Sequence, residues 1–211
     1  RLMVGGDANG ILSILAVIPE LYGAVGDGVA DDRAAIEGAC ASLGVSGGIV
    51  LLSSFASYYV SSLTVPAGCF IRGTMERPDY RLKNTSAGLV GLPGISLSSS
   101  GTILLGDNAG ITHTFVKRSG MTFPAADESL FAGSGISLGG DGCVVRNCLV
   151  VGFNKVLTVD AGLAFASRFT IDGLWGDGKN GIYLDKPSYD SSWIVNCHMY
   201  PFSSLPLTGA A

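Results

Sequence analysis

The sequence predicts an all-β chain whose short parallel strands coil into a β-solenoid, closed at its N-terminal end by one short helix. Three observations predict this fold class. Glycine is very frequent, with 31 among 211 residues, and charged residues make up only 14%, a composition typical of strands joined by tight turns. Short β-rich runs alternate with glycine-containing turns from residue 47 onward. One unit of strands and turns then recurs three times toward the C-terminal end.

The bulk composition argues against several classes of protein. A net charge of −4 disfavours a broad nucleic-acid surface, which would be basic. No apolar run reaches the length needed to cross a membrane. The five cysteines are odd in number and contain no CxxC spacing, so we expect buried free thiols rather than disulfides or a zinc site. No cofactor and no metal are predicted, because the chain has no cluster of oxygen ligands that would suit calcium.

The N-terminal part of the chain divides into two predicted segments. Residues 1–21 show no clear period and form a lead-in segment, and residues 22–46 form a capping turn and helix. The helix is predicted over 31–43, "DDRAAIEGACASL", with Asp31 as its N-cap. Helical spacing gives it one narrow apolar face that would lie against the strands. The residues of that face are Ile36, Ala39, Cys40 and Leu43.

The third predicted segment, residues 47–211, is the solenoid itself. The stretches "VRNCLVVGFN", "TIDGLWGDGKN" and "IVNCHMYPFSS" line up, and Asn147, Asp172 and Asn196 take the same place in each. Stacked turns would bring these three side chains into a ladder at one corner. An immunoglobulin-type sandwich would instead show regularly spaced hairpin turns. Because the sequence begins with Arg1 and offers no second cap, we expect a piece of a longer protein, truncated at its C-terminus.

The glycine and aspartate residues of "YGAVGDGVADDRAAI" at 22–36 allow two interpretations. A phosphate-binding loop would require the Lys-Ser/Thr pair of a P-loop, which is missing. The favoured interpretation is structural. Glycines permit sharp turns, Asp27 accepts hydrogen bonds from nearby backbone amides, and Asp31 and Asp32 cap the helix.

The same stretch, with "GGIVLL" and "LTVPAGCFIRG" after it, resembles the start of the pectate-lyase-like right-handed β-helix superfamily over residues 22–73. Residues 135–202 resemble the central part of bacteriophage tailspikes and tail-fibre depolymerases. That resemblance is carried by a Gly-Phe turn at 152–153, the turn "GDGKNGI" at 176–182 and the segment Asp190–Phe202. The resemblance implies a single-stranded right-handed parallel β-helix, assembled as a homotrimer.

The resemblance also implies a function. It predicts a tailspike-like protein of a phage virion, made in the host cytoplasm and acting at the bacterial cell surface. Its partners would be capsule or O-antigen polysaccharide, which it binds and hydrolyses, and other tail or baseplate proteins, with no nucleic acid and no membrane insertion. Two alternatives stay open: a non-catalytic structural or receptor-binding part of a phage tail, and a cellular pectate-lyase-like enzyme. Catalysis itself stays open, with glycoside hydrolysis favoured over a lyase reaction.

Candidate site residues follow from the chemistry that such a function needs. Glycoside hydrolysis uses two carboxylates that flank the scissile bond, and the candidates are Asp177, Asp185 and Asp190. Each of these aspartates would also suit a purely local role in a turn. Sugar binding uses flat aromatic rings beside hydrogen-bonding groups. The predicted substrate-binding residues are Trp175, Tyr183, Tyr189, Trp193 and His198.

Overall fold

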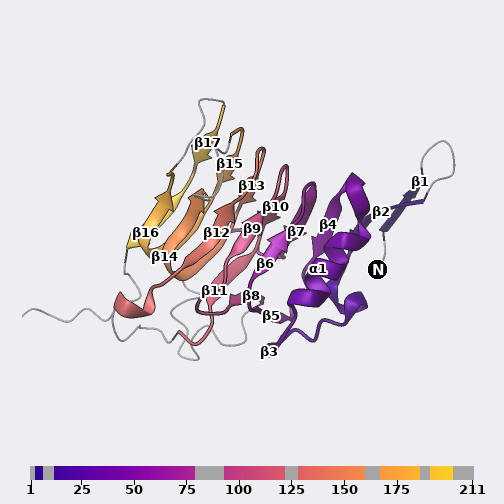
Figure 1. Ribbon diagram of the computed structural model, residues 1–211, viewed down its shortest axis with the longest axis horizontal. Helices are drawn as coiled ribbons and strands as arrows, with labels where there is room; N and C mark the ends of the chain where they lie inside the picture. The colour runs from indigo at the N-terminus through magenta and orange to yellow at the C-terminus, as the bar shows by residue number, and fades with distance from the viewer. Residues whose placement is uncertain are drawn as a thin grey trace, which may run out of the picture.

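The computed structural model describes residues 3–6, 12–78, 93–121, 128–159, 167–185 and 191–201. These residues are mostly β, and among them α1 (Arg33–Ser42) is the one α-helix (Figure 1). Short 3-10 helices add η1 (Pro19–Tyr22), η2 (Gly44–Ser46) and η4 (Glu128–Leu130). None of the described helices is long and apolar enough to cross a membrane.

The described strands belong to two sheets. The first has the order β1 (Met3–Gly6), β2 (Leu12–Val17), β4 (Gly48–Leu51), β7 (Cys69–Arg72), β10 (Gly110–Thr112), β13 (Val144–Arg146), β15 (Thr170–Asp172), β17 (Trp193–Val195). The second has the order β3 (Asp27–Asp31), β5 (Ser57–Val60), β8 (Gly94–Leu97), β11 (Phe115–Arg118), β14 (Leu149–Val159), β12 (Ser134–Leu138), β9 (Ile103–Leu105), β6 (Leu63–Val65). In addition, β16 (Trp175–Tyr183) pairs with β14 and with β18 (His198–Pro201). Of the described pairs, β1–β2 is antiparallel and the others are parallel.

The predicted single right-handed β-helix is wrong. The strands form two parallel sheets packed as a curled half-barrel, and the second sheet does not follow the chain in one direction. Its order runs from β3 to β14 and then turns back through β12 and β9 to β6, because β14 is long enough to pair with β11 at one end and β12 at the other. The prediction extended the unit that recurs around Asn147, Asp172 and Asn196 to the whole of residues 47–211. In the structure, the number of residues between one strand of the first sheet and the next decreases steadily along the chain. The in-register positions that show this are Ile71, Ile111, Val145, Ile171 and Ile194.

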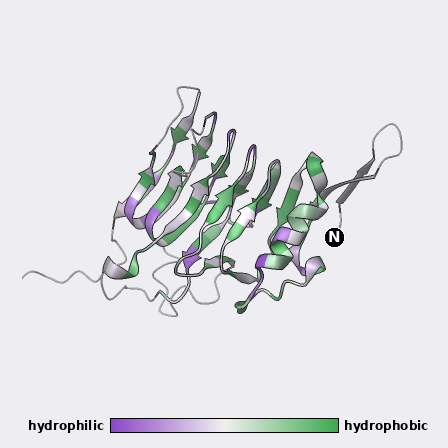
Figure 2. Ribbon diagram, in the orientation of Figure 1, coloured by the Kyte–Doolittle hydropathy of each residue, from purple (hydrophilic) through white to green (hydrophobic). Residues whose placement is uncertain are grey.

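Apolar columns across the strands form the core. Parallel, in-register pairing places one inward side chain of each strand directly over that of the next. Ile71, Ile111 and Val145 form such a column in the first sheet, and Tyr58 and Ile95 belong to another in the second. All five side chains are buried. Figure 2 shows the hydrophobic character running along the stacked strands.

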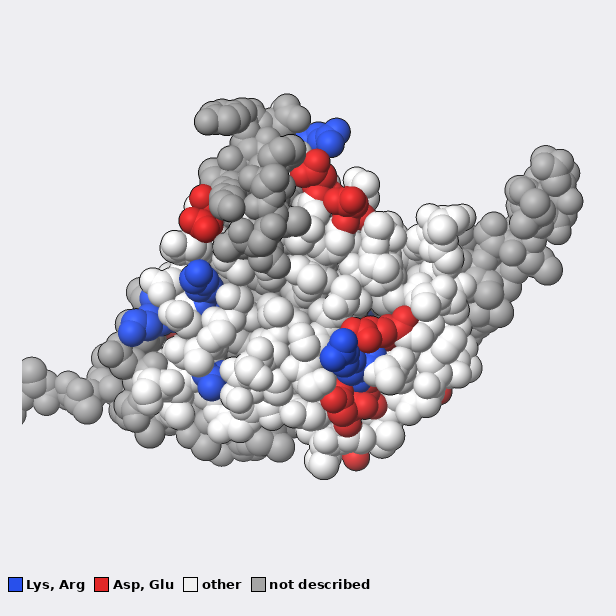
Figure 3. Space-filling view, viewed as in Figure 1, with Lys and Arg blue, Asp and Glu red and all other residues white. Residues whose placement is uncertain are grey.

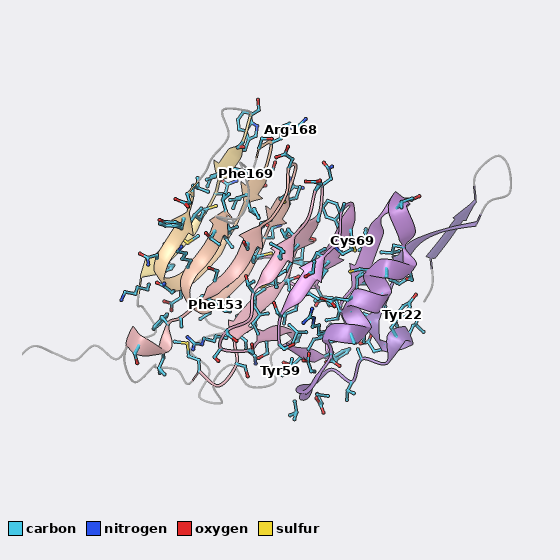
Figure 4. All side chains as sticks on the ribbon, viewed as in Figure 1. Tyr22, Tyr59, Cys69, Phe153, Arg168 and Phe169 are labelled. Atoms are coloured by element: carbon cyan, nitrogen blue, oxygen red, sulfur yellow. The ribbon has the colours of Figure 1, made fainter. Side chains whose placement is uncertain are left out.

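A bulge in β14 supplies the bend of the second sheet. The register between β14 and β16 shifts between Val151 and Phe153, and the intervening Gly152 has a φ of 94°. This left-handed backbone is strained for residues other than glycine. The extra residue turns Phe153 into the core, where its side chain is 1% exposed. Figure 4 shows both Phe153 and Phe169 in the C-terminal part of the stack, with Phe153 toward the lower ends of the strands in this view and Phe169 toward their upper ends.

Helix α1 lies beside β4 and β6 at the N-terminal end of the stack (Figure 1). The predicted apolar face is confirmed, since Ile36, Ala39, Cys40 and Leu43 are all buried. The predicted N-cap, Asp31, is wrong. The N-cap residue is Asp32, and its carboxylate makes no capping hydrogen bond.

The carboxylates of Asp31 and Asp32 accept hydrogen bonds from backbone amides around the start of the helix and on a neighbouring segment. Asp32 accepts hydrogen bonds from the amides of Val25 and Gly26, at 2.7 and 3.1 Å. Asp31 accepts from the amides of Arg33 and Ser61. The aspartates therefore fasten the turn that precedes the helix to the helix start and to the neighbouring strand.

Candidate functional site

A polar groove lies on the second sheet where β12, β14 and β16 are neighbours. Its volume is about 300 Å³. Ser137 of β12, Thr158 of β14 and Tyr183 of β16 stand directly beside one another in the parallel register. The neighbouring core column Ile136, Leu157 and Ile182 faces inward, and because side chains alternate along a strand, the polar column faces outward. The groove is lined by Ser100, Thr102, Ser134, Ser137, Lys155, Thr158, Val159, Tyr183 and Asp185.

Hydroxyl groups are the main polar feature of this groove. Five of its lining residues are serine or threonine. The hydroxyl of Thr102 is buried and has no hydrogen-bond partner among the described residues. The hydroxyl of Thr158 donates to the carbonyl of Val159 at 3.1 Å, which leaves its lone pairs able to accept. The groove therefore offers several donors and acceptors at the regular spacing of neighbouring strands.

One aromatic ring and two opposite charges stand in the groove. The ring of Tyr183 is 44% exposed. The Nζ atom of Lys155 lies 3.8 Å from the centre of that ring, a cation–π contact. Asp185 follows the end of β16 and is exposed. Tyr183 and Asp185 are thus the two sequence-predicted residues that the structure brings together here.

A second group of predicted residues lies at the other end of β16. The rings of Trp175 and His198 meet edge to face, with centroids 5.3 Å apart, and His198 stacks on Tyr200 at 3.9 Å. Trp175 packs against the side chains of Phe115 and Leu149 on the outward side of the sheet. His198 is exposed, whereas Trp175 and Tyr200 are partly buried, and this aromatic group lies apart from the groove.

Asp177 belongs to this second group and not to the groove. It stands between Val151 and Tyr200 in the register, and its side chain is fully buried. Most of β16, roughly 20 Å of extended strand, separates it from Asp185. A glycosidase needs its two carboxyl groups within about 5–9.5 Å of each other. The structure therefore does not bring Asp177 and Asp185 together as a catalytic pair.

The remaining predicted residues are placed elsewhere. Trp193 is 62% exposed and lies on β17, which belongs to the first sheet and not to the groove. Tyr189 and Asp190 lie outside the described residues. Within the described ranges, no group of histidine, cysteine, aspartate and glutamate side chains is arranged to hold a metal ion.

Sequence reasoning missed the hydroxyl column of the groove. The signal was present, because "GISLGG" and "VLTVD" each place one polar residue between apolar ones, at Ser137 and Thr158. Such alternation marks the outward face of a strand. What the sequence does not contain is the pairing of β14 with β12 on one side and with β16 on the other, which aligns the two hydroxyls with Tyr183.

Surface charge does not mark a binding face on the side of the molecule shown in Figure 3. Side chains of both signs gather over α1, where Arg33 and Glu37 form an ion pair at 3.1 Å. The described surface over the middle strands is mostly uncharged. A largely uncharged face with hydroxyl groups suits a ligand that is recognised by hydrogen bonding more than by charge.

The corner of the first sheet holds a histidine in strained geometry. His113 follows β10 with a φ of 55°, in the left-handed region also used by Asn147 and Asn196 at equivalent corners. The Nε2 atom of His113 lies 3.3 Å from Nδ2 of Asn147, and its Nδ1 atom is buried without a hydrogen-bond partner among the described residues. The predicted ladder is present only in part, since Nδ2 of Asn196 donates to Asp172 at 2.9 Å. Asp172 itself stands in register with the residue that precedes each of the two asparagines.

The environment of His113 disfavours its charged form. Burial lowers the pKa of the imidazole below its usual value, and the nearby guanidinium groups of Arg72 and Arg146 lower that pKa further. The unfolded chain binds a proton at the ordinary pKa of about 6.5. In this range the unfolded state therefore holds more protons than the folded state, and stability rises with pH.

Replacing His113 with asparagine is expected to reduce the loss of stability between about pH 7 and pH 5. Asparagine does not titrate, so the unfolded state no longer binds a proton at this position that the folded state excludes. Asparagine tolerates the left-handed backbone and matches Asn147 and Asn196. The measurement is the urea midpoint at several pH values. His198→Asn removes the only other histidine of the chain and serves as the control. If the urea midpoint falls equally with pH in wild type and in His113→Asn, His113 is not the group that makes stability depend on pH.

Comparison of the chain with known proteins identifies no relative. No protein-family model, no curated protein and no solved structure matches the chain.

Proposed function

We propose that this protein binds a bacterial surface polysaccharide, such as capsule or O-antigen, in the groove on β12, β14 and β16. The observation that carries the proposal is the outward column of Ser137, Thr158 and Tyr183 across three neighbouring strands. Sugar sites combine an aromatic ring, which covers the apolar face of a sugar, with hydrogen-bonding groups, which fix its hydroxyls. The groove supplies both within one open surface.

The resemblance to phage tailspikes supports a bacterial polymer as the ligand. On that resemblance we also propose a place on a phage tail, where the protein acts at the host surface as a homotrimer with other tail or baseplate proteins. An extended polymer suits the groove because the polar groups repeat from strand to strand at the sheet spacing of about 4.8 Å. A small compact ligand would use only part of them.

Binding is favoured over hydrolysis by the distribution of carboxylates. Among the described lining residues of the groove, Asp185 is the one acid. The other described candidate, Asp177, is fully buried at the far end of β16. One carboxylate can orient a sugar through its hydroxyls, whereas cleavage of a glycosidic bond uses two. The non-catalytic, receptor-binding form of the function therefore has the better geometric support.

Replacing Tyr183 with alanine is expected to weaken polysaccharide binding at least about tenfold, which corresponds to about 1.4 kcal/mol. The reason is the loss of the exposed ring that would stack on a sugar. The measurement is biolayer interferometry of wild type and variant on capsule and lipopolysaccharide purified from a panel of bacteria. Asp185→Asn is expected to weaken binding in the same direction, since it removes the charged acceptor.

The matched control is Trp193→Ala, which removes a more exposed aromatic ring from the first sheet. Its binding should equal that of wild type. Unchanged binding of Tyr183→Ala to a polymer that wild type binds would refute the groove as the site. Reducing ends are assayed in the same samples. Depolymerisation that Asp185→Asn abolishes would establish hydrolysis in place of simple binding.

A further inference from the structure

A mainly apolar pocket lies where the ends of β4, β7 and β10 meet the starts of β8 and β11. Its volume is about 220 Å³. The apolar walls come from four segments of the chain, and the side chains that form them are Leu52, Met75, Pro93 and Phe115. None of the described residues that line this pocket also lines the groove on β12, β14 and β16. The pocket is therefore a separate cavity that the proposed function does not use.

The size of the pocket suits one ring with a small substituent. In another protein, an apolar cavity of about 150 Å³ holds a benzene molecule. Met75 packs against the apolar cluster of Phe115, Leu149 and Val151 on the outward side of the second sheet. Its flexible thioether chain can adjust to the shape of a bound molecule.

Several polar groups around the pocket are already paired with one another. The amide of Gly73 donates to the carbonyl of Thr112 at 2.9 Å and to the hydroxyl of Thr114 at 3.1 Å. That hydroxyl donates in turn to the carbonyl of Thr112, and the amide of Met75 donates to the carbonyl of His113. Among the described lining residues, the buried side-chain atom without a hydrogen-bond partner is Nδ1 of His113.

The contact between His113 and Asn147 indicates where the proton of the imidazole lies. Nε2 of His113 is 3.3 Å from Nδ2 of Asn147. An amide nitrogen donates and does not accept, so Nε2 is the acceptor of this contact. Burial and the guanidinium groups of Arg72 and Arg146 lower the pKa of the imidazole, which favours the neutral ring. The single proton of that ring is therefore on Nδ1, and the pocket wall carries a buried N–H donor.

This donor determines which ligands the pocket favours. A buried N–H group without an acceptor is costly, and a ligand oxygen placed beside it removes that cost. The nearby guanidinium groups of Arg72 and Arg146 also favour negative partial charge at this place. A purely apolar molecule would leave Nδ1 without an acceptor, whereas a sugar would lose its hydration against the apolar walls. The combination of apolar walls and one placed donor is typical of small-molecule sites.

We propose that this pocket binds a compact apolar group that carries a carbonyl oxygen, such as an aromatic ketone or anilide. The apolar body lies against Phe115 and Met75, and the oxygen accepts a hydrogen bond from Nδ1 of His113. The proposal also accounts for a histidine at this corner, because the equivalent corners hold Asn147 and Asn196. The site does not depend on polysaccharide binding in the groove.

The test is titration of the intact chain with acetophenone and with ethylbenzene, followed through backbone amide resonances. The two probes have nearly the same shape, and ethylbenzene has a methylene group in place of the carbonyl. Each is added up to its own solubility limit. We expect saturable shifts at Gly73, Met75 and Thr114, and an affinity for acetophenone about fivefold higher than for ethylbenzene, the effect of one hydrogen bond.

Two variants separate the hydrogen bond from the apolar contact. His113→Asn should abolish the preference for acetophenone and leave ethylbenzene binding nearly unchanged. Met75→Ala should weaken binding of both probes, because it removes part of the apolar wall. The matched controls are His198→Asn and Met121→Ala, which remove the same residue types outside the pocket. Both controls should bind the two probes as wild type does.

Equal affinity of wild type for the two probes overturns the proposal, and so does a preference for acetophenone that His113→Asn retains. Absence of saturable shifts at the pocket residues overturns it as well. The comparison of the two probes in wild type needs no variant, so it decides the matter even if a variant does not fold. Tyr183→Ala, which alters the groove, should leave the affinity for both probes unchanged, so the two sites can fail independently.

Discussion

Replacing Phe153 with alanine is expected to lower the free energy of unfolding by about 3–5 kcal/mol, the range for large aromatic side chains removed from a core. The ring is 1% exposed and packs in the main apolar cluster at the bulge of β14. Alanine leaves a cavity there, and the backbone at Gly152 is already held in a left-handed conformation, which limits collapse around the void. Urea unfolding followed by circular dichroism measures the change.

Phe55→Ala is the matched control, because the ring of Phe55 is 94% exposed. Its removal should change stability by no more than about 0.5 kcal/mol. Losses of similar size for the two variants would mean that the bulge does not turn Phe153 into the core as the structure describes.

Asp32→Ala is expected to lower the free energy of unfolding by roughly 2–4 kcal/mol. The carboxylate is 2% exposed and accepts the amide hydrogens of Val25 and Gly26. Alanine leaves two backbone donors in partly buried hydrogen bonds without their acceptor, and the expected loss lies below twice the cost of a fully buried unsatisfied group, which is about 1–3 kcal/mol. Thermal and urea unfolding measure the loss, and Asp32→Asn, which keeps one acceptor oxygen, should lose less.

Asp27→Ala is the comparison for this variant. Its carboxylate also accepts two backbone amides, those of Val29 and Ala30, but it does so in solvent, which can replace the bonds. The loss should therefore be clearly smaller than for Asp32→Ala. Equal losses would show that burial of Asp32 does not determine its contribution.

The local features of the chain could be predicted from its sequence. The spacing of Ile36, Ala39, Cys40 and Leu43 specified helix α1 and its buried face. The predicted local role of Asp27 is also confirmed, since it accepts the amides of Val29 and Ala30. Such features depend on residues close together in the chain. The N-cap was wrong by one residue: the carboxylate of Asp32 binds the preceding turn, and that of Asp31 is shared between the amides of Arg33 and Ser61.

The shape of the sheets could not be predicted in the same way. The curled half-barrel depends on β14, which pairs with β11 before the bulge at Gly152 and with β12 after it. In the sequence this strand reads as two short apolar runs, "CLVVGF" and "VLTV". In the sequence alone, two apolar runs joined through a bulge cannot be distinguished from two separate strands. A prediction based on repeats therefore does not recognise β14 as one strand.

The candidate site shows the same limit. Tyr183 and Asp185 are close in sequence and come together, but the hydroxyls beside them come from β12 and β14. Asp177 belongs to the same strand as Tyr183, yet it faces a different neighbourhood. Density of aromatic and acidic residues along the chain therefore pointed to β16 but grouped two separate parts of that strand as one.

The parallel pairing of strands that are distant in sequence also limits the rate at which this chain folds. Ile71 pairs with Ile111, and Ile111 with Val145, so each sheet step closes a long loop before it gains a contact. Among the described pairs only β1–β2 is antiparallel and able to form locally. Chains dominated by such distant pairings fold in milliseconds to seconds rather than microseconds. Refolding by dilution from urea should accordingly be slow, and the unpaired strands should make yield fall as protein concentration rises.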